Sequence, residues 1–132
     1  MSTECYCGAL RLAARKTTAI YDAALKPAGI NVAQYSLLRC IERAEMISLT
    51  DLARGTGLDR STIGRNVRVL ERLGLITGAA ADDRRESCVT LARGGAETLK
   101  TALPLWRKAQ AKIEQSISQD AAQQLRSLLA TL

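Results

Sequence analysis

Residues 49–91, LTDLARGTGLDRSTIGRNVRVLERLGLITGAAADDRRESCVTL, contain the pattern that decides the fold. Their periodicity predicts a short helix, a Gly-containing turn, a second helix and a ribbon of two β-strands. The second of these helices, over about residues 59–73, carries Ile63, Val67 and Leu70 on one side. Apolar residues at this helical spacing indicate a face that packs against a core.

The opposite side of this second helix is cationic. Ser61, Arg65, Arg68 and Arg72 follow one another along it at spacings of four, three and four residues. Gly64 borders the row, although Gly inside a helix costs about 1 kcal/mol relative to Ala, and closer approach of a large partner would compensate for that cost. Such a face is expected of a recognition helix in a DNA major groove, where Arg contacts guanine edges and phosphates. The alternative is an ordinary solvated surface.

Turns and caps separate the two helices. Ser48 and Asp51 have the spacing of a capping box, in which Asp51 would reach back to the Ser48 amide. Gly55–Gly57 provides a sharp turn, Leu58 is expected to fill the core behind it, and Asp59 is expected to cap the second helix. Together these features predict a helix-turn-helix.

A β-ribbon is expected after this motif. Residues 75–77 predict a short strand, and Val89 and Leu91 should point inward from a returning strand, with Cys88 pointing outward. Two strands behind a recognition helix form a wing, and an Arg at its tip can enter the minor groove, although an ordinary charged turn is the alternative. The tip consists of Asp82, Asp83, Arg84 and Arg85.

Further helices are predicted on both sides of this region. One runs from about residue 2 to 25, and the next, from about 32 to 44, follows the N-cap Asn31. Cys40 falls in the apolar stripe of that helix and is expected to be an inert core residue. A long helix over about residues 96–116 should bend at Pro104, and Ser118 should cap a final helix.

The final helix is too apolar to face water. The first helix and the last two lack a partner in so small a domain, so they would bury their apolar faces against a second subunit. We therefore expect a homodimer, with residues 30–92 as the DNA-binding part and residues 1–29 and 93–132 as dimerisation helices. The apolar residues of the final helix are Ala122, Leu125, Leu128, Leu129 and Leu132.

Composition restricts the classes of function. The 132 residues suggest one domain, and the net charge of +6 favours a polyanionic partner. Between Thr50 and Arg93, however, eight Arg residues oppose six acidic ones, so placement carries more weight than bulk charge. With no His and no visible nucleophile–base pair or phosphate-cradling loop, we expect no catalytic residue, metal site or cofactor. No signal peptide or long apolar run is visible, which favours the cytoplasm.

The stretch ISLTDLARGTGLDRSTIGRNVRVLERLGLI, residues 47–76, and the wing-like DDRRESCVTL, residues 82–91, resemble the MarR family of winged-helix transcription regulators. The resemblance extends over about residues 5–113. It implies a mainly α fold with a small β-wing, a homodimer with interleaved chain ends, and repression or activation at a pseudo-palindromic operator. The family's Asp-x-Arg pair is matched by Asp83 and Arg85, whereas Ala80 and Asp82 stand where a second such pair often occurs, leaving the tip less positive.

We expect the contacts with double-stranded DNA to divide by type. Ser61, Arg65 and Arg68 would face base edges and phosphates, and Arg85 the minor groove. Arg60 and Arg72 would touch the backbone or pair with acids. Thr62, Gly64, Asp83 and Arg84 complete the expected interface. The chain would act as a repressor released by a small molecule or an oxidant; the alternative is a winged-helix protein-interaction module that does not read DNA sequence.

The cysteines add a second resemblance. Residues 7–10, with Tyr21 fourteen residues after Cys7, are similar to the organic-hydroperoxide sensors of the family, in which the matching Cys is the reactive thiol and the matching Tyr its hydrogen-bond partner. A further tyrosine of that subgroup falls on Val32 here. Cys5 and Cys7 would point opposite ways within a helix, so a disulfide would need another partner. We expect Cys7 near the junction of the dimer and DNA-binding parts; the alternative is a small packing residue in a reducing cytosol.

Overall fold

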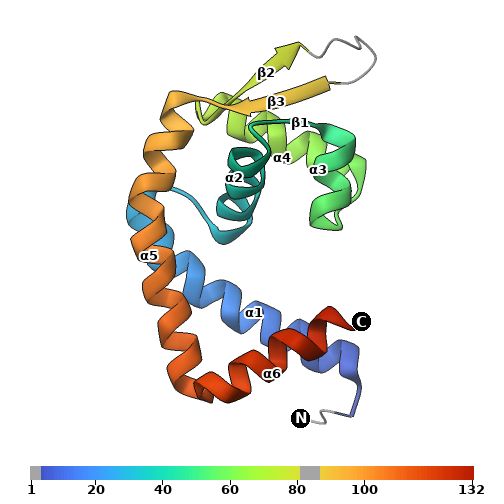
Figure 1. The fold of residues 1–132 in the computed structure, drawn as a ribbon, viewed down its shortest axis with the longest axis vertical. Coiled ribbons are helices and arrows are strands. Elements are labelled where there is room, and N and C mark those ends of the chain that lie inside the picture. Colours follow the sequence, from blue (N-terminus) through green and yellow to red (C-terminus); the bar gives the residue numbers. More distant parts are fainter. Residues whose placement is uncertain (1–3, 81–86) are drawn as a thin grey trace.

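A computed structural model describes residues 4–80 and 87–132. Figure 1 shows a C-shaped chain in which α2, α3, α4 and a small sheet form one end, here called the head, while α1, α5 and α6 form the arm. The predicted class, mainly α with a small β-wing, is confirmed. The elements are α1 (Tyr6–Leu25), the 3-10 helix η1 (Lys26–Ala28), α2 (Val32–Ala44), β1 (Met46–Ser48), α3 (Leu49–Thr56), α4 (Arg60–Arg72), β2 (Ile76–Ala80), β3 (Ser87–Leu91), α5 (Arg93–Ile117) and α6 (Gln119–Ala130).

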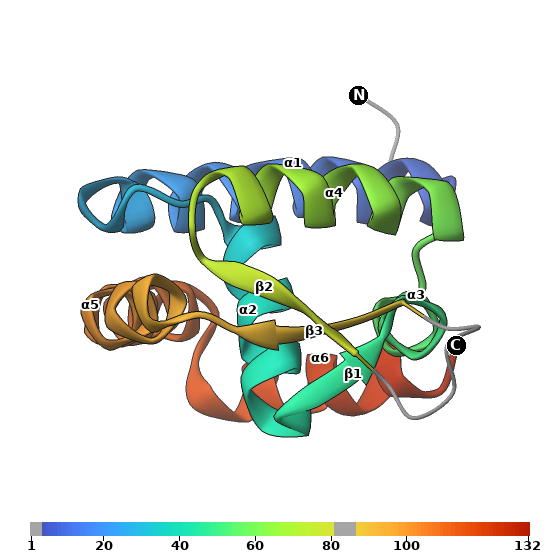
Figure 2. The ribbon, with the colours of Figure 1, turned by 90° about the horizontal axis from the view of Figure 1, so that it is seen from above.

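The sheet has three strands, one more than predicted. They are antiparallel in the order β1-β3-β2, with β3 in the middle, as the view from above shows (Figure 2). Ile47 of β1 lies opposite Val89 of β3, and Gly78 of β2 lies opposite the same residue from the other side. The additional strand, Met46–Ser48, is too short for an alternating pattern to reveal it.

The burial of Cys88 differs from the prediction. Cys88 is paired with Ser48 on one side and with Ala79 on the other. Its residue exposure is only 8%, so it is buried rather than directed outward into solvent. The prediction failed because alternation along a strand does not show what packs over each face, and Cys88 lies with Leu49 and Arg68 around the hollow between the sheet and α4.

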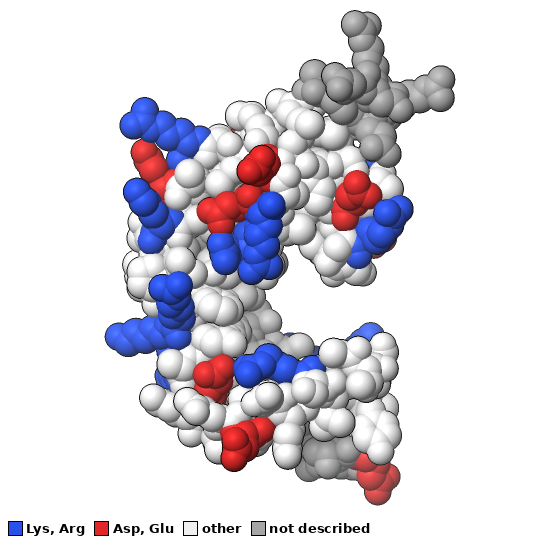
Figure 3. Space-filling model, in the orientation of Figure 1, with Lys and Arg blue, Asp and Glu red and all other residues white. Residues whose placement is uncertain are grey.

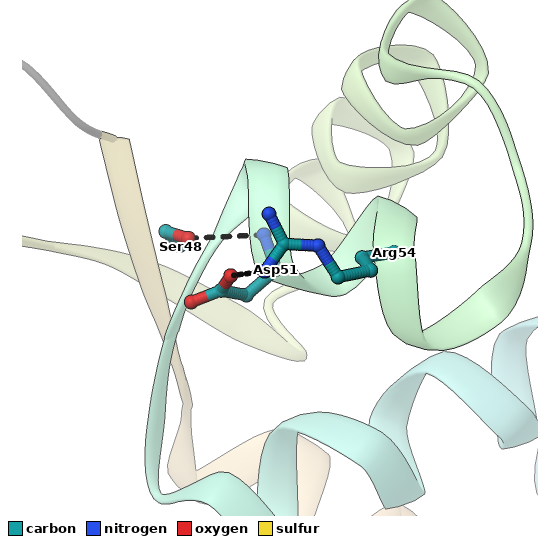
Figure 4. A network of polar contacts seen from close by, with 3 residues as sticks. All are labelled: Ser48, Asp51 and Arg54. Carbon is teal, nitrogen blue, oxygen red and sulfur yellow. Dashed lines mark hydrogen bonds and ion pairs between the residues drawn. The ribbon is translucent and has the colours of Figure 1, made fainter.

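Two caps fix the starts of α2 and α3. Asn31 accepts a hydrogen bond from the Gln34 amide at 2.9 Å, and the Gln34 side chain accepts one from the Asn31 amide at 3.0 Å, which completes a capping box. At α3, Ser48 Oγ accepts from the Asp51 amide at 3.0 Å, but the Asp51 carboxylate pairs with Arg54 at 3.2 Å (Figure 4). The Asp51 side chain therefore contacts the next turn of α3. The prediction that it would reach back to the Ser48 amide is wrong.

The head contains most of the buried core. Ile63 and Leu70 of α4 are fully buried and Val67 nearly so, which confirms the predicted inner face of that helix. Leu58 is not part of this core: its exposure is 42%, because the residue follows the left-handed turn at Gly57 on the outside of the helix-turn-helix. The core cluster also contains Leu25, Ile30, Tyr35, Leu37, Leu38, Ile41, Leu52, Leu75, Ile76, Val89, Leu99 and Ala102.

Two helices of the arm begin at other residues than predicted: α1 begins later and α5 begins earlier. α1 begins at Tyr6 and not near residue 2, because Cys5 is extended with φ −86° and ψ 116°. α5 begins at Arg93, three residues before the predicted start, and includes both Gly94 and Gly95. It contains Pro104 and follows a curved course along the outer edge of the molecule (Figure 1). Both shifts lie at helix ends, where the sequence pattern is weakest.

The arm buries little of its own apolar surface. In α1 only Leu25 is buried, and in α6 only Ala122. Figure 3 shows that arm and head face each other across an open hollow, so α6 receives no cover from the head. The exposed apolar side chains of α6 are Leu125, Leu128 and Leu129, followed by Leu132 at the end of the chain. In the part of the chain that the structure describes, no helix is both long and apolar enough to cross a membrane.

Candidate nucleic-acid interface

The helix α4 presents a cationic row on the face opposite its buried one. Its sequence divides as predicted: Ile63, Val67 and Leu70 face inward, while Arg65 and Arg68 are exposed. Ser61 and Arg72 are exposed on the same outer side, and Arg60 is exposed at the first turn. α4 packs on α3 and on β2, so the helix-turn-helix and the sheet together fix the direction of this face.

The arginines of α4 lack acidic partners within the described part of the chain. No ion pair with Arg60, Arg65, Arg68 or Arg72 occurs among residues 4–80 and 87–132, so the expectation that Arg60 and Arg72 pair with acids finds no support there. By contrast, some arginines outside α4 are paired, as in Arg54–Asp51 and Arg93–Glu97. Unpaired guanidinium groups along one exposed face remain available to an external anion.

The predicted cap of α4 by Asp59 is confirmed, and it is part of a larger side-chain hydrogen-bond network that was not predicted. Asp59 caps the helix: its Oδ1 accepts from the Thr62 amide and from Ser61 Oγ, each at 2.8 Å. Its Oδ2 accepts from Thr62 Oγ1 at 3.0 Å, and Thr62 Oγ1 accepts from Arg65 Nη2 at 3.2 Å. The backbone bond from Thr62, then the bonds from Ser61 and the Thr62 hydroxyl, lower the pKa of Asp59 to about 2. The three-residue spacing of Asp59, Thr62 and Arg65 was the signal available in the sequence.

Gly64 is open toward the outside of α4. A β-carbon built on it would have the Arg68 Nη2 at 3.9 Å as its nearest neighbour. Packing within the chain therefore does not require a glycine here, which is consistent with close approach of an external partner. Beside it, Arg68 and Cys88 lie among the residues around a hollow of about 540 Å³ between α4 and the sheet.

The predicted wing tip cannot be placed in the same way. Asp82, Asp83, Arg84 and Arg85 lie outside the described residues. The strands that lead to and from this segment, β2 and β3, pair from Ile76 with Leu91 to Ala80 with Ser87. The predicted β-ribbon behind α4 is therefore present, and the contacts of its tip stay a prediction.

The four cysteines occupy different environments. Cys5 and Cys7 are exposed free thiols, Cys40 is half-buried and Cys88 is buried. Because Cys5 precedes α1 with an extended backbone, the helical geometry assumed for the pair Cys5–Cys7 does not apply. Cys40 packs against the core, as expected, but it also lines a hollow of about 410 Å³ between α2, the α3–α4 turn and Asn66.

Cys7 and Tyr21 lie at opposite ends of α1. Fourteen residues of α-helix separate them by ~21 Å, so the two side chains of one chain cannot meet. Cys7 is in the first turn of α1, at the end of the arm far from its own head (Figure 1). The expectation that it falls near the junction of arm and head is therefore wrong within one chain, because α1 runs away from that junction toward its N-terminus.

Tyr21 does lie at this junction. It stacks on Trp106 at 6.3 Å between ring centroids, and Tyr35 stacks on the same indole at 5.6 Å. The Tyr21 hydroxyl donates a hydrogen bond to the Gln110 side chain of α5. Burial, and secondarily Glu114 and Tyr35, raise the pKa of Tyr21, so its hydroxyl remains a proton donor at neutral pH.

The described residues contain no candidate site for a metal ion. Among residues 4–80 and 87–132, no three or more Cys, Asp or Glu side chains cluster closely enough to hold a metal ion. The residues brought together on this side of the head are instead arginines and hydroxyl groups, whose chemistry suits anionic oxygen atoms.

Comparison with known proteins assigns the chain to a family. Residues 28–86 match the sequence profile of the MarR family. The structure is similar to the Mycobacterium tuberculosis transcriptional regulator MosR in complex with DNA, with a TM-score of 0.89 and 34% identity over 97% of this chain and 92% of that chain. A probable transcriptional regulator from Pseudomonas aeruginosa gives a TM-score of 0.90 with 26% identity over 97% and 96% of the two chains.

A mutant of Escherichia coli MarR complexed with operator DNA shares the fold, with a TM-score of 0.87 and 22% identity over 92% of this chain and 89% of that chain. No curated protein matches the chain. The similarity to MosR extends over nearly the whole of both chains and is accompanied by the matching family profile. This chain belongs to the MarR family of transcription regulators.

Proposed function

We propose that the protein regulates transcription by binding a pseudo-palindromic DNA operator as a homodimer. The observation that carries the proposal is the face of α4, where exposed arginines without acidic partners among the described residues oppose a fully apolar inner face. The MosR relative, 34% identical, was crystallised in complex with DNA, which supports the same partner here. We place its action in the cytoplasm, where a chromosomal operator would be reached.

The contacts divide by position on the interface. Arg65 and Arg68 lie in the middle of the exposed face of α4 and, with Ser61 in its first turn, would reach base edges, whereas Arg60 and Arg72 at its two ends would contact phosphates. Thr62 and Gly64 border this row. Asp83, Arg84 and Arg85 would form the wing tip, with Arg85 in the adjacent minor groove. Residues 30–92 would then form the DNA-binding part of the chain.

The homodimer would form through the arm, residues 1–29 and 93–132. Leu128 is 66% exposed and Leu129 is 44% exposed, on a helix of which only Ala122 is buried. Apolar surface of this extent is normally covered by a partner. A second copy supplies an equivalent surface under two-fold symmetry, and the same symmetry would place two α4 helices on the two half-sites of a palindrome, about 34 Å apart.

Salt and sequence dependence test the DNA-binding function. Binding should weaken steeply as the salt concentration is raised, because phosphate contacts release counterions. The protein should also bind its operator at least about 10³-fold more tightly than a random duplex. The rival proposal, a protein-interaction module on the same scaffold, requires the helix to bind an acidic protein. A titration that gives equal affinity for all duplexes would favour this rival. The MosR–DNA complex and the family profile favour the regulator.

We further infer that the chain is a repressor, released by an oxidant or a small molecule, with Cys7 as the thiol that would sense an oxidant. The Cys7 thiolate would attack the terminal oxygen of a hydroperoxide and break the O–O bond, which gives a sulfenic acid and an alkoxide; the alkoxide would take a proton from water to become an alcohol. Cys7 is an exposed free thiol in the first turn of α1, where a peroxide in solution can reach it. Tyr21 of the same chain is ~21 Å away along the helix. Its hydroxyl could therefore donate a hydrogen bond only to the Cys7 thiol of a second subunit.

A further inference from the structure

Three side chains at the start of α4 form a hydrogen-bond chain with one possible direction. Arg65 Nη2 donates to Thr62 Oγ1 at 3.2 Å, and Thr62 Oγ1 donates to Asp59 Oδ2 at 3.0 Å. A guanidinium group can only donate and a carboxylate can only accept. The hydroxyl proton of Thr62 must therefore point to Asp59, which leaves an oxygen lone pair facing Arg65.

The end of this chain is a fixed negative charge. Asp59 is held by its own cap, since its Oδ1 accepts from the Thr62 amide and from Ser61 Oγ, each at 2.8 Å. These bonds keep the pKa of Asp59 at about 2, so the carboxylate is ionised in neutral solution. Both bonds of the chain, Arg65 to Thr62 and Thr62 to Asp59, therefore include a charged group, which makes them stronger than bonds between neutral groups.

Arg65 differs in this respect from the other exposed arginines of its row. Arg68 and Arg72 are not restrained in this way, since neither side chain forms a hydrogen bond with another described residue. A free arginine side chain loses many rotamers when it binds a base edge, and that loss opposes binding. A guanidinium group that is already held in one orientation loses fewer.

We propose that Thr62 is a positioning residue for Arg65, whose hydroxyl orients the guanidinium group for reading a base and so contributes to sequence discrimination without a base contact of its own. The proposal rests on the proposed DNA-binding function. Two groups of Thr62 act at this helix end: the backbone amide donates to Asp59 Oδ1 as the cap bond, while the hydroxyl donates to Asp59 Oδ2 and accepts from Arg65. Replacing the hydroxyl alone should leave the cap in place.

The experiment compares Thr62→Val with Thr62→Ser. An operator is first selected by the wild-type protein from a randomised duplex library, and the affinity ratio of this operator to a random duplex of equal length is measured at fixed salt. Thr62→Val has the same shape without the hydroxyl and should lower the ratio by roughly tenfold, at the low end of one base contact. Thr62→Ser retains the hydroxyl and should retain the ratio.

A matched control and a second background complete the design. Thr101→Val makes the same change at an exposed helical threonine of α5, whose hydroxyl donates to the Glu97 carbonyl, and should leave the ratio unchanged. In an Arg65→Ala background, Thr62→Val should have no further effect, because Thr62 acts through Arg65. Additive losses would overturn the proposal by showing a direct contact of Thr62, as would equal damage from Thr62→Ser and Thr62→Val.

A measurement without DNA separates this proposal from the proposed function. The ¹⁵N relaxation of the Arg65 guanidinium group should show restricted motion in the wild type and in Thr62→Ser, and greater motion in Thr62→Val. A freely moving Arg65 in the wild type would overturn the role of Thr62 even where an operator is selected. A restrained Arg65 in a protein that selects no operator would instead refute sequence-specific DNA binding. The contribution of the Thr62–Arg65 hydrogen bond to sequence discrimination would be refuted with it.

Discussion

Gly95 lies so close to Leu75 that a β-carbon on Gly95 would stand 2.0 Å from the Leu75 carbonyl oxygen. The same oxygen accepts a hydrogen bond from the Ala92 amide at 3.0 Å. The first turn of α5 is thus held directly against the turn that ends α4, where Gly74 has a φ of 74°. Because the arm starts at this contact, the contact fixes the direction of the arm relative to the recognition helix α4.

Gly95→Ala should therefore be strongly destabilising. The added methyl group would meet backbone at Leu75 and also the Leu91 side chain at 2.8 Å, so the helix must move away from the turn. We expect a loss of about 1–3 kcal/mol or more in the free energy of unfolding, measured by urea denaturation at constant protein concentration. Gly8→Ala is the matched control in a helix: its β-carbon would stand 3.8 Å from that of Cys5, and it should stabilise by up to about 1 kcal/mol. Equal effects of the two changes would contradict the close contact.

The cap of α4 should make stability depend on pH in acid. The hydrogen bonds of Asp59 lower its pKa from 3.8 to about 2 in the folded chain. The unfolded chain therefore takes up a proton first, so the stabilisation is complete above the unfolded value of 3.8 and is lost as pH falls toward 2. Asp59→Asn keeps an acceptor for the Thr62 amide but does not titrate. Thermal unfolding should show a shallower decline in stability for this variant between those two pH values, and parallel curves would exclude the shift.

Arg68 and Arg72 should affect DNA binding differently. Arg68 lies in the middle of the exposed face of α4, whereas Arg72 lies in its last turn. Arg68→Ala should cost about 1–3 kcal/mol at the operator and relax the preference at one base position. Arg72→Ala should weaken operator and random duplexes alike and reduce the slope of log affinity against log salt by about 1. An Arg68→Ala variant with unaltered preference would show that α4 is not placed in the major groove as proposed.

The starts of the helices that have an N-cap residue recognisable in the sequence were predicted to within one residue. α2 begins after Asn31 and α4 begins after Asp59, and in both cases the cap side chain accepts a hydrogen bond from the third helical residue. Such caps are local interactions, so the sequence around them is sufficient to locate a helix start. The start of α1 was misplaced because Cys5 forms no side-chain cap bond and its extended backbone leaves no sign in the sequence.

Features that depend on distant partners were missed. β1 exists because Met46–Ser48 pairs with residues 88–90, forty or more residues later, and three residues have no recognisable period. At the interface, the row from Ser61 to Arg72 followed from helical spacing, whereas the chain from Arg65 through Thr62 to Asp59 depends on side-chain rotamers that no periodicity specifies.

The arm should associate through α6. The wild-type protein is expected to sediment at twice its chain mass of 14.2 kDa at micromolar concentration. Leu128→Arg places a charge on the exposed apolar face of α6 and should shift the equilibrium to the monomer, with loss of operator binding. Met46→Arg makes the same exchange at an apolar side chain that is 50% exposed on the head, and should leave the mass unchanged. A wild-type monomer under these conditions would rule out the proposed dimer.

Oxidation should act through Cys7 and not through Cys40. Cys7 is exposed at the tip of the arm, whereas Cys40 is half-buried against the core of the head. A sulfenic acid at Cys7 would either persist or condense with a second thiol and release water, and a bulkier or tethered group in the dimer interface would change the separation of the two α4 helices. Since both half-sites must be contacted at once, operator affinity should fall. The test measures that affinity before and after treatment with cumene hydroperoxide for the wild type, Cys7→Ser and Cys40→Ser. We expect loss in the wild type and in Cys40→Ser, and none in Cys7→Ser; equal loss in the wild type and Cys7→Ser would place the sensor elsewhere, and an unresponsive wild type would leave a small molecule as the releasing signal.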